Sequence, residues 1–134
     1  MPDHVNVQTL ENNRAKFAFE EIKAVSEKLN DKRKKEYKSW AKKIAVMIKA
    51  NGLGQTMAFL RSKMKEENDT ESHYGFYYGL TAKWLEKKKM IEPKTDLLET
   101  VVSIESVEYR RFTRESIALF NWVRRFADGY LNQK

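Results

Sequence analysis

The sequence predicts an all-α fold, a compact bundle of five to six helices in a single domain spanning residues 1–134. Only two prolines and five glycines interrupt the chain, and its long segments carry apolar residues at helical spacing. No segment alternates polar and apolar residues for long enough to predict a strand. The apolar fraction of 41% and the aromatic fraction of 12% are sufficient for a packed core.

Three helices are expected in the N-terminal half, after a flexible N-terminus at residues 1–6. Asn30 and Asp31 end the first helix and cap the second, since short polar side chains favour both positions. The second helix ends at Asn51 and Gly52, which tolerate the left-handed conformation of a helix C-terminus. We place these helices at about 7–29, 31–50 and 53–66.

The polar residues 67–70 predict a loop, and three more helices follow it at about 71–89, 97–102 and 106–131. Pro93 breaks the chain, and Thr95 with Asp96 caps the short helix. The last helix has the most regular pattern, because its apolar residues fall within about 100° of one another. They are Phe112, Leu119, Trp122, Val123, Phe126 and Tyr130.

Positive charge is concentrated in one part of the chain, whose net charge is +7. Between Lys32 and Lys65 there are eleven Lys or Arg residues and one acidic residue, Glu36, whereas the remainder from Glu66 onward is nearly neutral. Such asymmetry points to a polyanionic partner.

On the second predicted helix, Lys38, Lys42 and Lys49 fall within about 60° of Lys35 at 100° per residue. An apolar seam lies opposite, comprising Tyr37, Trp40, Ile44, Met47 and Ile48. A solvated helix face normally mixes charges of both signs, and this one does not. We therefore interpret the four lysines, called the lysine ridge below, as a surface for the nucleic-acid backbone.

The last helix carries a second basic face, the arginine cluster of Arg110, Arg114, Arg124 and Arg125. Glu108 and Glu115 are expected elsewhere on this helix. Arginine suits both phosphate contacts and protein–protein pairing, and the pattern does not decide between them. Arg61 completes the candidate RNA-binding residues.

Catalytic, metal and cofactor sites are not predicted. The chain has no cysteine, and its two histidines, His4 and His73, are far apart. The absence of a secretory signal and of a membrane-length apolar run leads us to expect a cytoplasmic protein without membrane contact.

Residues 37–39 with 52–60, and residues 109–119 with 122–127, resemble the small helical subunit of type III-B CRISPR effector complexes, the Cmr small subunit. The resemblance extends over most of the chain, and Ser116 departs from an expected alanine. It implies a non-catalytic helical bundle, with copies that stack beside the other subunits. It also implies contact with CRISPR RNA and target RNA without base readout, in antiviral defence.

Two alternatives remain. The first is a helical protein-interaction adaptor whose basic face docks an acidic protein. The second is a DNA-binding regulator, for which the helix at 53–64 offers only Gln55, Thr56 and Arg61 for base contacts.

Overall fold

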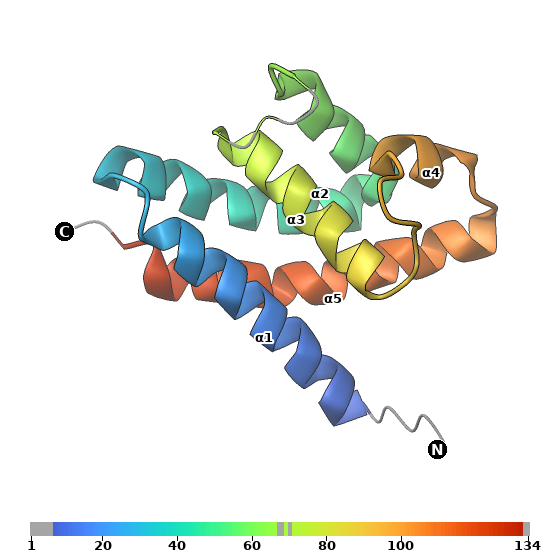
Figure 1. Ribbon diagram of the computed structural model, residues 1–134, viewed down its shortest axis with the longest axis horizontal. Helices are drawn as coiled ribbons and strands as arrows, with labels where there is room; N and C mark the ends of the chain where they lie inside the picture. The colour runs from blue at the N-terminus through green and yellow to red at the C-terminus, as the bar shows by residue number, and fades with distance from the viewer. Residues whose placement is uncertain (1–6, 67–68, 70, 133–134) are drawn as a thin grey trace.

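The computed structural model describes residues 7–66, 69 and 71–132, which form five helices and contain no strand. This confirms the all-α prediction. The helices are α1 (Val7–Ser26), α2 (Asp31–Lys63), α3 (His73–Lys87), α4 (Leu97–Ser103) and α5 (Ser106–Tyr130) (Figure 1). The flexible N-terminus predicted at residues 1–6, with His4, lies outside the described residues, as do three of the four residues of the predicted loop at 67–70.

The two longest helices, α2 and α5, pack against each other and run antiparallel. Lys38 near the start of α2 donates to Asn132 just after α5, while Gly54 far along α2 donates to Tyr109 near the start of α5. Helix α1 packs on α5, and α3 and α4 pack on α2 (Figure 1). The core between them is apolar and aromatic, and its largest fully buried side chains include Trp84, Tyr37, Tyr77 and Phe120.

Helix α2 is interrupted by a kink at Gly52, the position where the sequence predicted one helix to end and the next to begin. Gly52 has a positive φ of 85° and non-helical backbone angles, which glycine adopts readily. A Cβ at this position would lie 2.6 Å from the hydroxyl oxygen of Tyr109. That same hydroxyl accepts a 2.9 Å hydrogen bond from the Gly54 N–H. Tyr109 therefore holds the bend, and the chain resumes its helix directly after it.

The helix starts follow the predicted caps. The Asn30 side chain accepts from the N–H of Arg33, and the Asp96 side chain accepts from the N–H of Glu99. The helix ends differ more from prediction: α1 ends at Ser26 rather than Leu29, and α2 ends at Lys63 rather than Glu66. Periodicity alone does not fix a C-terminus that lacks a glycine or proline stop.

Candidate nucleic-acid interface

The lysine ridge lies on the surface of α2. Lys35, Lys42 and Lys49 are exposed, and within the described part of the chain none makes a side-chain hydrogen bond or an ion pair. Lys38 is half-buried, and its Nζ donates to Asn132 Oδ1 over 3.1 Å. Three of the four ridge cations thus have no partner among the residues that the structure describes.

The acidic residue nearest to the ridge in sequence, Glu36, lies on a different side of α2. Its charge acts on both Tyr37 and His73, which places it toward α3. The other acid of α2, Asp31, is in the first turn, four residues before Lys35, and therefore lies at the N-terminal end of the ridge face. Among the described residues it forms no ion pair with Lys35, and the ridge carries four cations beside this one acid.

Part of the predicted apolar seam is not buried. Trp40 and Met47 are half-buried, and Val46 is 55% exposed. Together with Lys42 and Lys43 they line a shallow apolar hollow, in which the Lys43 Nζ lies 4.7 Å from the centre of the Trp40 ring. The other ridge-helix residues assigned to the seam, Tyr37, Ile44 and Ile48, are buried as expected. The basic face of α2 consequently borders an exposed apolar patch.

His73, at the start of α3, packs behind this patch. Its ring stacks on Trp40 at 5.7 Å between centroids, and its Nε2 is buried without a partner among the described residues. Burial lowers the pKa of His73, and the positive charges of Arg33 and Lys43 lower it further against the opposing charge of Glu36. A neutral imidazole held among aromatic rings indicates a packing role.

The four residues of the arginine cluster are spread along α5 and differ in their surroundings. Arg110 and Arg125 are exposed and Arg124 is half-buried, and none has a side-chain partner within the described ranges. Arg114 instead lines a pocket with Arg111, on the side of α5 nearest to α1 and to the end of α3. Arg61, near the end of α2, is half-buried and lies apart from the residues that line this pocket.

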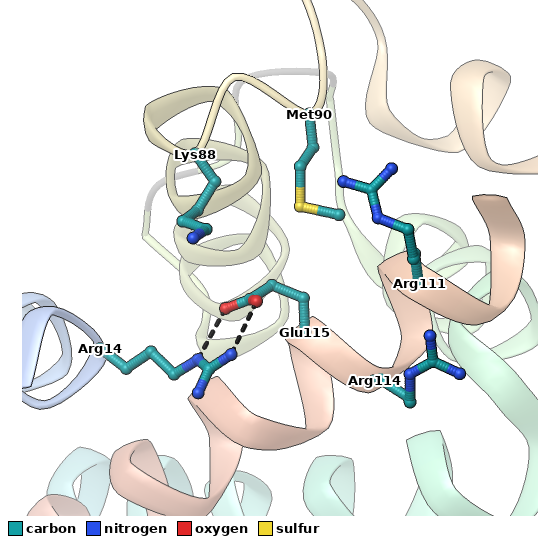
Figure 2. A pocket seen from close by; sticks show the side chains of 6 residues that line it. All are labelled: Arg14, Lys88, Met90, Arg111, Arg114 and Glu115. Carbon is teal, nitrogen blue, oxygen red and sulfur yellow. Dashed lines mark hydrogen bonds and ion pairs between the residues drawn. The ribbon is translucent and has the colours of Figure 1, made fainter. Parts of the chain in front are cut away.

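Glu115 follows Arg114 in the sequence and also lines this pocket (Figure 2). Its side chain extends toward Arg14 of α1, away from the Arg114 guanidinium (Figure 2). Glu115 is nevertheless only 9% exposed, because Arg14 from α1 covers it. Arg14 Nε and Nη2 each donate to the Glu115 carboxylate over 2.8 Å (Figure 2).

The contact extends into a partly buried chain of hydrogen bonds, which we call the Arg14 network. Trp84 Nε1 of α3 donates to Glu115 over 2.8 Å. On the other side, Arg14 Nη1 donates to Glu11, and Glu11 accepts from Trp122 Nε1 of α5. The network therefore joins α1, α3 and α5 through five side chains.

The surroundings of Glu115 favour its ionised form. Burial by itself raises the pKa of Glu115, but the hydrogen bonds from Arg14 and Trp84, with the charges of Arg14 and Lys88, outweigh burial and lower the pKa. The hydrogen bond to Glu115 also raises the pKa of Arg14, despite its partial burial. Sequence analysis missed this pair because 101 positions separate the two residues and neither belongs to a motif.

Residues 7–66, 69 and 71–132 contain no group of three or more His, Cys, Asp or Glu side chains that could hold a metal ion. No helix in these ranges combines the length and apolarity needed to cross a bilayer. The most conspicuous chemical feature of the described surface is therefore its unpaired positive charge.

Comparison with known proteins identifies relatives of this chain. Residues 10–130 match the family model described as CRISPR-associated protein (Cas_Cmr5). The chain is also similar to the CRISPR system Cmr subunit Cmr5 of Thermus thermophilus, with 28% identity over 103 residues. That alignment covers 73% of this chain and 77% of the relative.

Proposed function

The chain belongs to the Cmr5 family of CRISPR-associated proteins, and on this premise we propose that it is a non-catalytic small subunit of a type III-B CRISPR complex. In this proposal it works in the cytoplasm in antiviral defence, and its basic face contacts the backbone of the guide–target RNA. The assignment to this complex rests on family membership.

The observation that supports RNA contact is the lysine ridge. Three of its ammonium groups have no partner among the described residues, so binding a phosphate backbone breaks no internal ion pair. Each contacted phosphate releases condensed counterions, which favours binding regardless of sequence. Lysine acts as a point charge on a flexible stem, so the ridge suits backbone contact rather than base readout.

A single bundle of this size neutralises few phosphates, and copies of the subunit stacked along the RNA supply the rest. Linking several weak sites raises the overall affinity through effective concentration, without new contacts in any one copy. The partners in this proposal are CRISPR RNA, target RNA, further copies of the same chain and the other subunits of the complex.

The test is a tagged pull-down from the native host, with sequencing of the bound RNA. The expected result is a set of short RNAs that share one repeat-derived end, together with several co-purifying subunits. Recovery of a single acidic protein and no discrete RNA contradicts the proposal and favours the helical adaptor.

A further inference from the structure

A second basic site lies away from α2, in the pocket beside the Arg14 network (Figure 2). The pocket has a volume of about 420 Å³, within the range of small-ligand sites. Its walls are Arg14 from α1, Lys88 and Met90 after α3, and Arg111, Arg114 and Glu115 from α5. Met90 is the one apolar side chain among them, and the other five lining side chains are charged.

The three α5 residues line one wall because of their spacing. Positions 111, 114 and 115 are related as i, i+3 and i+4, which places their side chains on one helix face. The segment that follows α3 supplies another wall, with Met90 beside Arg111 and Lys88 on the side of Glu115 and Arg14 (Figure 2). Four cations from three parts of the chain thus line one cavity.

The one carboxylate in the pocket, that of Glu115, already has hydrogen-bond donors from the protein. Both carboxylate oxygens of Glu115 accept hydrogen bonds from Arg14, and one of them also accepts from Trp84. Lys88 and Arg114, by contrast, have no side-chain hydrogen bond or ion pair with any residue that the structure describes.

Arg111 is paired, but loosely. It contacts Glu108 over 2.8 Å on the same helix, and the two side chains are 52% and 46% exposed. Solvent-exposed pairs of this kind contribute little to stability, so an incoming anion can compete for the guanidinium.

We propose that this pocket binds one phosphate group of a nucleic-acid backbone, with Arg111 and Arg114 as forked donors and Lys88 as a point charge. A phosphate offers oxygens in several directions to three cations, whereas a planar carboxylate matches one guanidinium. With a single apolar wall, the pocket has little to hold a base or an apolar peptide side chain. This proposal rests on the proposed RNA-binding function and adds a contact formed without α2.

The three tryptophans of the chain give a test that separates the two basic sites. The Trp84 indole N–H donates to Glu115 and so reports on the pocket, whereas Trp40 lies beside the ridge residue Lys42 and its neighbour Lys43. The experiment follows the indole N–H signals of the full chain by ¹H–¹⁵N NMR. Three probes are titrated separately: inorganic phosphate, a short RNA duplex and a polyglutamate peptide.

The test variant is Lys88→Gln with Arg114→Gln. The control is Lys28→Gln with Lys87→Gln, which removes the same charge from exposed positions outside this pocket. None of the four side chains is paired within the described ranges, so both variants are expected to fold like the parent.

We expect phosphate and RNA each to shift the Trp84 signal in the parent and in the control. In the test variant the phosphate-induced shift of Trp84 disappears, and RNA affinity falls by roughly 5-fold or more, because two of the three cations that contact the phosphate are lost. The RNA-induced shift of Trp40 persists in that variant, because the ridge is intact.

Other outcomes overturn the proposal in distinguishable ways. If RNA shifts Trp40 but leaves Trp84 unmoved, the pocket is not a backbone site and the proposed function stands. If phosphate alone shifts Trp84, the pocket takes a free anion, and if polyglutamate shifts it while RNA does not, the partner is an acidic protein. If RNA shifts neither signal and is not bound, the pocket and the RNA-binding function both fail.

Discussion

The cations of the lysine ridge and the cation of the Arg14 network differ in how the fold treats their charge. Arg14 is shielded, and its guanidinium donates to two carboxylates, each of which also accepts from a tryptophan indole. Lys35, Lys42 and Lys49 are exposed and have no partner among the described residues. The Arg14 charge that joins helices is shielded and paired, whereas the charge of these lysines is open to solvent and to a ligand.

This difference predicts opposite consequences for mutation. Removing a charged member of the Arg14 network leaves a shielded charge without its partner and should lower the free energy of unfolding. Removing a ridge lysine leaves no unsatisfied group, so the fold should tolerate it while binding suffers.

The largest effect on stability is expected for Glu115→Ala. It leaves Arg14 Nε and Nη2 and the Trp84 indole N–H without their acceptor in a shielded site, so the free energy of unfolding should fall by about 3 kcal/mol. Urea denaturation measures this loss. Arg111→Gln is the matched control, since it breaks an exposed pair on the same helix and should cost less than about 1 kcal/mol. Equal losses of stability in the two variants would contradict the proposed difference between the shielded Arg14 network and exposed charge pairs.

The pH dependence of stability is the next expected difference. The pKa of folded Glu115 lies below its ordinary value of 4.5, so its ionised form favours the folded state. That contribution is fully present above about pH 4.5 and is lost as the pH falls through the lowered pKa. Glu115→Gln cannot ionise, and thermal unfolding should therefore depend less on pH below 4.5 than in the parent. Identical acid profiles would show that Glu115 is not ionised in the fold.

A smaller loss is expected for Trp122→Phe. The indole N–H that donates to Glu11 over 2.9 Å disappears, while most of the apolar ring area is kept. Because Trp122 is only partly buried, water can replace the donor, and the free energy of unfolding should fall by about 1 kcal/mol. Thermal denaturation checks this value. A loss as large as that of Glu115→Ala would mean that the Trp122 end of the network is as enclosed as the Trp84 end.

The helices could be predicted because their signals are local. Gly52 marked the bend in α2 and Asp96 the start of α4, since each position depends on one residue's own conformation or cap. The ridge could be located in the same way, because the spacing of Lys35, Lys42 and Lys49 on one helix is fixed by helical geometry.

Contacts between distant helices could not be predicted in this way. Arg14 meets Glu115 only because α1 packs across α5, and no spacing within either helix encodes that crossing. The half-burial of Trp40 has the same origin, because it depends on which part of α2 is covered by α3. Periodicity identifies an apolar face but not how much of that face a neighbouring element covers.

The central claim, that the ridge binds RNA and does not support the fold, is tested most directly by reversing it. The variant replaces Lys35, Lys38, Lys42 and Lys49 with Glu. The matched control makes the same change at Lys16, Lys23, Lys28 and Lys87, which are exposed on α1, on the turn after it and on α3. Retention of an RNA duplex is measured for both as a function of salt, alongside circular dichroism.

We predict that the ridge variant keeps its helicity and loses RNA retention together with most of its salt dependence, whereas the control retains more RNA. RNA retention by the ridge variant equal to that of the control would contradict the account and leave the ridge as a solvated helix face.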